Sequence, residues 1–209
     1  MAGKSLVRFT LHRTVLFCLL LVPFAAASDH WDYEESHSDV RDFVSGGTLH
    51  VRLSVGDLRI LRGESNKIRL HYTVKSRRES HVKNAKVDFE VRGSDASIAF
   101  HASGNNTQFD VELEVPQNTN LDVHEKVGDL TVEDIEGDKE LTLRVGDIRV
   151  DAVHSGYRLV HASTSIGDVN SNGYGETSGW LGKTLKYHGD GKYELRAHVS
   201  VGDITLEGR

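Results

Sequence analysis

Apolar and polar residues alternate along most of this chain, which is the pattern of half-buried β-strands. The clearest run covers 68–74, and similar runs cover 49–53, 85–91 and 109–115. No segment after the N-terminus shows an apolar stripe with helical spacing. The sequence therefore predicts an all-β protein.

A second pattern interrupts the alternation: an apolar residue, Gly-Asp and another apolar residue, as in LTLRVGDIRV (141–150). Val145 and Ile148 are three apart, so a continuous strand would place them on opposite faces. We expect the chain to bend at Gly146-Asp147 so that both face one core. Glycine allows φ > 0, and aspartate accepts nearby backbone N–H groups. The five copies have their glycines at 56, 128, 146, 167 and 202.

Two structures satisfy such a bend: a two-residue hairpin, or a corner where a strand turns into the next strand of a solenoid. The steps between the glycines are 72, 18, 21 and 35 residues. If one rung has about 18 residues, the first step corresponds to four rungs and the last step to about two. The corner missing from the last step would be a degenerate copy of the motif at 181–185. A hairpin would also pair Arg144 with Arg149. The sequence thus favours a β-solenoid or β-prism-like repeat with parallel stacking. An antiparallel β-sandwich is the alternative, because residues before Pro116 also fit antiparallel strands.

The N-terminus has the features of a signal peptide, predicted to cover residues 1–27. Lys4, Arg8 and Arg13 precede the apolar run 15–22, and 25–27 is Ala-Ala-Ala. Cleavage would remove the single cysteine, Cys18, and with it any disulfide or thiol nucleophile. No later stretch is apolar enough to span a bilayer. We therefore expect an exported protein, in the periplasm, at the cell surface or outside the cell.

The formal net charge is −6 and becomes −9 without Lys4, Arg8 and Arg13. Such an acidic protein is a poor candidate for binding nucleic acid or anionic membranes. Residues 28–45 hold six acidic residues and one arginine, and we interpret them as a flexible acidic lead-in to an all-β repeat domain at 46–209. The alternative is that Trp31, Tyr33 and Phe43 attach this segment to the domain or to a partner.

Residues 116–150 and 196–208 resemble the DUF4097 group of bacterial exported β-repeat proteins. The shared features are the proline before the repeats, the recurring Gly-Asp-Ile/Leu/Val units, a Gly-rich stretch at 173–191 and a final Gly-Asp-Ile strand. Members of the group are often described as candidate adhesins. The resemblance implies a β-solenoid or β-prism-like domain in the cell envelope, and no catalytic residues.

Five aspartates of the repeat are candidate metal ligands, since stacked rungs would place carboxylates about 5 Å apart. Calcium is the metal that such carboxylates would bind, but capping of each aspartate's own turn is the favoured role, and we otherwise expect no cofactor. The five are Asp57, Asp129, Asp147, Asp168 and Asp203.

The chain has no G-x-S-x-G or H-E-x-x-H motif, and its histidines fall mostly at polar positions of strands. We therefore expect no enzyme activity and no metal site. The Gly-rich stretch contains Trp180, Tyr174 and Tyr187, which are candidate contacts with a sugar or a protein partner. The favoured alternative is that Trp180 and Tyr187 cover the end of the solenoid.

These features favour an exported, non-catalytic binding or adhesion module whose partner is a surface glycan or an envelope protein. A second hypothesis is a structural or regulatory envelope protein that binds another protein through residues 28–45. A third is a polysaccharide hydrolase, which would need clustered carboxylates or basic residues in a groove on one face.

Overall fold

The computed structural model describes residues 31–208, which contain fifteen strands, a five-residue helix α1 (Glu79–Lys83) and a 3-10 turn η1 (His154–Gly156). The predicted signal peptide, 1–27, lies outside the described residues. Within the described part, no helix has the length and apolar character needed to cross a membrane. The prediction of an all-β protein is confirmed; the short helix in the charged connection after Ser76 was not predicted.

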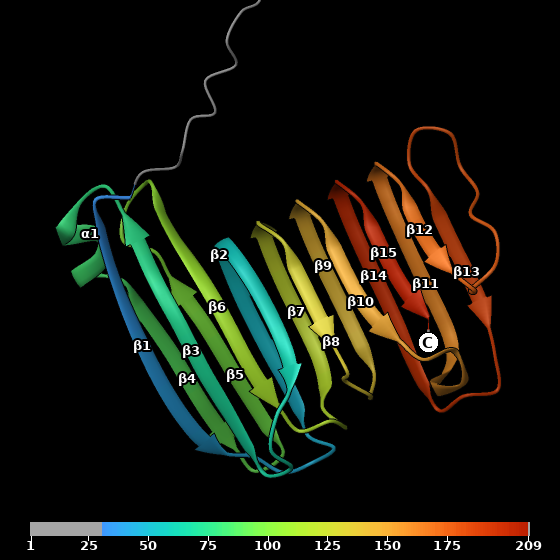
Figure 1. Cartoon of the computed structure of the whole chain (residues 1–209), viewed down its shortest axis with the longest axis horizontal. Coiled ribbons are helices and arrows are strands. Elements are labelled where there is room, and N and C mark those ends of the chain that lie inside the picture. Colours follow the sequence, from blue (N-terminus) through green and yellow to red (C-terminus); the bar gives the residue numbers. More distant parts are fainter. Residues whose placement is uncertain (1–30, 209) are drawn as a thin grey trace, which may run out of the picture.

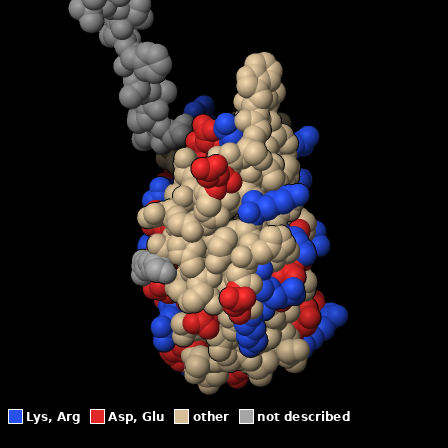
Figure 2. Space-filling view, turned by 90° about the vertical axis from the view of Figure 1, so that its right-hand side faces the viewer, with Lys and Arg blue, Asp and Glu red and all other residues tan. Residues whose placement is uncertain are grey.

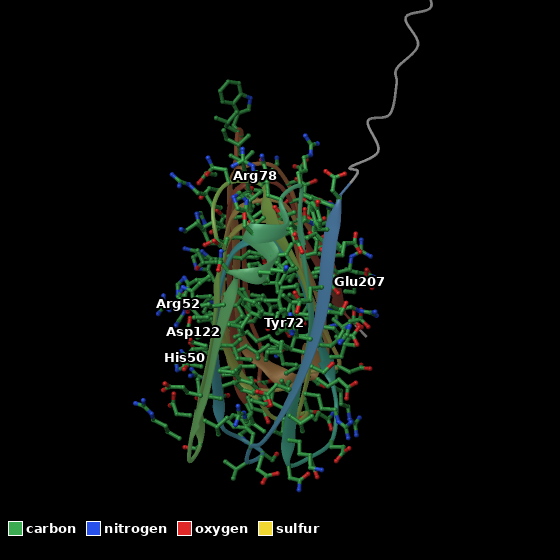
Figure 3. The ribbon with its side chains drawn as sticks, turned by 90° about the vertical axis from the view of Figure 1, so that its left-hand side faces the viewer. His50, Arg52, Tyr72, Arg78, Asp122 and Glu207 are labelled. Atoms are coloured by element: carbon green, nitrogen blue, oxygen red, sulfur yellow. The ribbon has the colours of Figure 1, made fainter. Side chains whose placement is uncertain are left out.

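The strands form two layers that face each other across one hydrophobic core (Figures 1 and 3). The long strand β2 (Thr48–Arg62) belongs to both layers. Sheet A contains, in spatial order, β1 (Tyr33–Asp42), β3 (Lys67–Ser76), β6 (Thr107–Val115), the second half of β2, β8 (Leu130–Glu133), β10 (Ile148–Ala152), β15 (Ile204–Gly208) and β12 (Val169–Asn172). Sheet B contains β4 (Lys86–Arg92), β5 (Asp95–His101), the first half of β2, β7 (Asn120–Val127), β9 (Lys139–Val145), β14 (Tyr193–Val201), β11 (Tyr157–Ile166) and β13 (Thr184–His188).

Every Gly-Asp copy lies where the chain leaves sheet B and enters sheet A. β9 pairs in parallel with β7 and β14, whereas β10, directly after the corner at 146–147, pairs in parallel with β8 and β15. The two strands on either side of the corner are therefore not partners. The prediction of a solenoid-like corner is confirmed and the hairpin alternative is wrong.

The order in which the rungs stack differs from the order predicted by the glycine spacing. The first half of β2 lies directly beside β7, so no rung separates the first two corners in space. The residues between them form β3, β4, β5 and β6. β5 and β6 stack in parallel on the other side of β2, as one rung without a Gly-Asp pair, whereas β3 and β4 pair antiparallel with their neighbours. The proposed copy at 181–185 is not a rung either, because β13 pairs antiparallel with β11. Parallel stacking requires that corners align in space, not that rungs follow one another in sequence.

The segment predicted to be a flexible acidic lead-in is mostly a strand. Residues 33–42 form β1, which pairs antiparallel with β3 over its whole length. Phe43 follows it into the core and is only 2% exposed. The alternative in which aromatic residues attach this segment is thus correct for Phe43, while Tyr33 is exposed. Residues 28–30 lie outside the described part of the chain.

One detail of the predicted corner is wrong. Ile148 is buried, but Val145 is 42% exposed, so the chain has already turned outward before the glycine. Register pairs link Val145 to equally exposed β-branched residues on its neighbours. We call this exposed row the corner ridge; it consists of Val55, Val127, Val145, Val201 and Ile166.

The glycines of the corners are required because adjacent rungs stack backbone against backbone. Gly146 has φ +128°, and a Cβ added there would lie 1.8 Å from the carbonyl oxygen of Gly128. Gly128 stands in the same relation to the carbonyl oxygen of Gly56, at 1.6 Å. No side chain can be accommodated without displacing the neighbouring rung.

Replacing Gly146 with alanine should therefore lower the free energy of unfolding by about 3 kcal/mol or more, through backbone strain and the clash with the neighbouring corner. Gly156→Ala is the matched control, because that glycine has open space around its Cβ position. The control should change stability by less than about 1 kcal/mol. Chemical denaturation measures both; equal effects of the two substitutions would contradict this account of the corner.

Candidate functional site: the corner edge and the outer face of sheet B

The five aspartates of the corners form a continuous hydrogen-bonded ladder. The backbone N–H of Asp129 donates to Oδ1 of Asp57 (3.2 Å), and that of Asp147 donates to Oδ1 of Asp129 (3.0 Å). Asp203 and Asp168 continue the series at 2.8 and 2.7 Å. Four of the carboxylates thus cap the corner of the adjacent rung and not, as expected, their own turn; Asp168, at the end of the series, takes part only through its backbone N–H.

Because four of the five carboxylates each engage a backbone amide, the ladder has a structural use of its own. Among residues 31–208, no group of three or more His, Cys, Asp or Glu side chains has an arrangement that could hold a metal ion. Burial and the neighbouring carboxylates of Asp129 and Asp110 raise the pKa of Asp57, although the amide of Asp129 acts in the opposite direction.

The outer face of sheet B carries two rows of basic and hydroxyl side chains next to the corner ridge. In the strand register, Arg52 is paired with His124. Lys126 and Arg144 lie beside each other, because the residues before them (Glu125 and Leu143) and after them (Val127 and Val145) are paired. From β2 to β11, no Asp or Glu occupies these rows. Their members are Arg52, His124, Thr142, His198 and Ser163 in one row, and Ser54, Lys126, Arg144, Ser200 and Ser165 in the other.

Seven members of these rows line a surface hollow of about 550 Å³, which we call the basic hollow. The rest of its lining comes from neighbouring positions, among them His101 and the buried Glu125. Arg52, Lys126 and Arg144 line it, are exposed, and make no salt bridge with any described residue. The neighbouring row, which contains His50 and Asp122, does include a carboxylate. Asp122 contacts both His50 (2.7 Å) and His124 (3.1 Å). Figure 3 shows Arg52, His50 and Asp122 projecting from this face, opposite to Glu207 on sheet A.

The outer face of sheet A has the opposite charge. It carries Asp110, Glu112 and Glu114 on β6 and further carboxylates along the stack, with only a few cations among them. One of these cations, Arg59, is paired with Glu133 at 2.9 Å. The two basic rows of sheet B therefore contrast with the acidic outer face of sheet A, and sequence reasoning missed these rows. A usable signal existed: the residue two before each corner glycine is always Ser, Lys or Arg.

The three aromatic residues singled out from the sequence occupy different environments. Tyr174 is 1% exposed and its ring lies 4.0 Å from that of His154 and 5.2 Å from that of Tyr187. Trp180 is 95% exposed on the loop between β12 and β13, and Leu181 is 64% exposed. The end of the molecule that carries this loop is covered mainly by uncharged side chains (Figure 2). Of the three residues, Trp180 is the most exposed.

Lys139, the first residue of β9, is a buried lysine. Burial lowers the pKa of Lys139 to about 7, and its Nζ donates to the Tyr157 hydroxyl (2.6 Å) and to the Gly137 carbonyl (3.1 Å). Tyr157 and Tyr193 line an adjacent cavity of about 230 Å³, but Lys139 is not among its lining residues. The lysine therefore ties a loop to the core and does not face a substrate-sized space.

Glu125 is the exception in an otherwise uncharged inward column of sheet B. It lies between Leu53 and Leu143, is 3% exposed, and neither carboxylate oxygen has a hydrogen-bond partner among the described residues. Burial, with smaller contributions from Asp57 and Asp129, raises the pKa of Glu125 to about 8. The folded protein therefore holds this carboxyl in its neutral form at neutral pH.

No family model matches the chain, and no curated protein matches it significantly. Among solved structures, a protein of Clostridium sporogenes named a "putative cell adhesion protein" has a TM-score of 0.51 at 15% identity, over 84% of this chain and 100% of its own. An adhesin-named protein of Bacteroides fragilis has a TM-score of 0.28 at 8% identity, over 82% of this chain and 97% of its own. The first similarity shows a shared fold, and the second is too weak to support an argument.

Glu125 gives a testable pH dependence. Because its pKa is raised in the folded state, the folded protein keeps a proton that the unfolded chain releases above about pH 4.5. The free energy of unfolding should therefore fall between about pH 4.5 and 8, by on the order of 4 kcal/mol from this group. Glu125→Leu should remove that contribution and stabilise the protein at pH 8. Denaturation of both proteins across this range measures the difference, and parallel stability profiles would contradict it.

Proposed function

We propose that the protein is an exported, non-catalytic binding module that contacts a surface glycan or an envelope protein through Trp180. The observation that supports this most is the 95% exposure of a tryptophan beside an exposed leucine. Leaving such large apolar side chains in water gives the folded chain nothing, whereas burying them against a partner is favourable.

The loop that presents Trp180 is anchored at its base. Ser178 and Thr184 exchange backbone hydrogen bonds of 3.0 and 2.8 Å, and Lys183 donates its backbone N–H to the Thr164 hydroxyl at 3.0 Å. Tyr174 fixes the other arm of the loop by packing into the core. An exposed aromatic on an anchored loop loses little conformational freedom on binding, which favours affinity.

The other two hypotheses differ in how the structure bears on them. A hydrolase would need clustered carboxylates or basic residues in a groove; the basic hollow has such cations, and a hollow on sheet A is lined by Asp57, Asp110, Glu112 and Asp129, so this hypothesis stays open to an activity assay. Binding through the acidic segment 28–45 would have to use the outer edge of β1, because β3 occupies the other edge. The similar fold of a protein named for cell adhesion agrees with the first proposal, as does the signal peptide predicted from the sequence.

Trp180→Ala should weaken binding at least about tenfold, a loss typical of a central aromatic contact. The mature chain from Ser28 would be labelled and tested on a glycan array and on intact bacterial cells. Trp180→Phe should retain most of the binding, and Val153→Ala, another exposed apolar residue, is the matched control. Unfolding should be unchanged in all three. Equal binding by wild type and Trp180→Ala, or no binding by wild type to either surface, would contradict the proposal.

A further inference from the structure

We propose that the basic hollow on the outer face of sheet B is a second binding site, for a linear acidic polysaccharide bearing carboxylate or sulfate groups. Arg52, Lys126 and Arg144 would bind its anionic groups. The site does not involve Trp180, which lies on the loop between β12 and β13, so the two surfaces can be tested separately.

The first argument is that these three cations lie in one hollow and lack salt-bridge partners, whereas Arg59, Arg158 and Arg196 on the outer faces have them. Arg158 and Arg196 both bind Glu194, Arg196 at 2.6 Å, and Arg59 binds Glu133. Lys126 and Arg144 instead lie next to each other on adjacent strands, about 4.8 Å apart along the sheet. Like charges in that position destabilise a sheet, so the fold gains nothing from them. A bound anion would relieve this repulsion.

The second argument is the chemistry between the cations. Ser54, Thr142 and Ser200 line the same hollow and offer hydroxyl groups as donors and acceptors. A polysaccharide has hydroxyl groups along its whole length, with charges at intervals, and this mixture matches both kinds of side chain. No Phe, Tyr or Trp belongs to the two rows between β2 and β11, and Phe100, which also lines the hollow, is only 4% exposed. The hollow therefore presents no open Phe, Tyr or Trp ring on which the bases of a single-stranded nucleic acid could stack.

The third argument is the narrowness of the basic surface. Beyond the row of Lys126 and Arg144 lies the corner ridge, and immediately beyond that the aspartate ladder. A broad anionic surface such as a membrane would meet the carboxylates of the ladder as it approached the hollow. A single extended chain can lie along the hollow without reaching them, so the geometry favours a polymer over a lipid bilayer.

A second copy of this protein could also present negative charge, through the acidic outer face of sheet A. Several carboxylates there are already neutralised within the molecule, because Lys75 binds Asp110 and Arg59 binds Glu133. The basic hollow has no such internal partners. Polysaccharide is therefore favoured over self-association, which the experiment below also measures.

The test is binding of the mature protein to polygalacturonate oligosaccharides and to dextran sulfate, with uncharged dextran as the matched neutral polymer. We expect binding to at least one anionic polymer, none to dextran, and weakening as salt rises from about 50 to about 300 mM. The variant Arg52→Ser/Lys126→Ser/Arg144→Ser should bind at least about tenfold more weakly. The control Arg62→Ser/Arg77→Ser/Arg78→Ser removes the same charge from exposed positions elsewhere and should bind like wild type. Trp180→Ala should also bind these polymers like wild type.

Several outcomes would overturn the proposal. Equal losses in the two triple variants would show a response to net charge alone. Failure to bind either anionic polymer would exclude the site, as would tighter binding to oligothymidylate or to phosphatidylglycerol vesicles. Sedimentation of wild type as a dimer that the first triple variant abolishes, without polysaccharide binding, would assign the hollow to a second copy. No variant should lower the unfolding midpoint, because the substituted side chains are exposed, and the first triple variant should raise it slightly by removing the repulsion between Lys126 and Arg144.

Discussion

The contact between consecutive corners is the constraint on which the rest of this structure depends. Glycine carbonyls approach so closely that no Cβ fits, and four of the five aspartate carboxylates accept the amide of the next corner. These contacts bring equivalent residues of each rung into line. The corner ridge, the aspartate ladder and the basic rows are all consequences of that alignment, because each is one sequence position repeated across neighbouring rungs.

How much the sequence predicts follows from which interactions are local. The bend at each Gly-Asp and the burial of Ile148 depend on residues close in the chain, and both were predictable. The exposure of Val145 was not predictable, because the strand is already distorted one residue before the glycine that marks the bend in the sequence. The order of the rungs was not predictable either. β2 pairs with β7, whose corner lies 72 residues later in the sequence, and no pattern in the intervening residues indicates this pairing.

Functional features divide in the same way. Trp180 was found from composition, since a tryptophan among glycines is conspicuous, but the burial of Tyr174 in the same stretch depends on His154, which is distant in sequence. The basic hollow needed the rung register to be known, because Arg52 and Lys126 are 74 residues apart. Glu125 interrupts an inward column and could have been found by aligning the repeats. Its lack of partners could only be seen in three dimensions.

The stacking order also determines how the chain can be assembled. The rung formed by β14 and β15 is the last in sequence, yet it lies between the rung of β9 and β10 and that of β11 and β12. During synthesis, β11 and β12 therefore emerge from the ribosome before the strands on which they will pack exist. Successive addition of rungs therefore pauses at β10 until β14 and β15 have been synthesised. Two strands that follow β11 and β12 in sequence are thus an internal part of the finished stack.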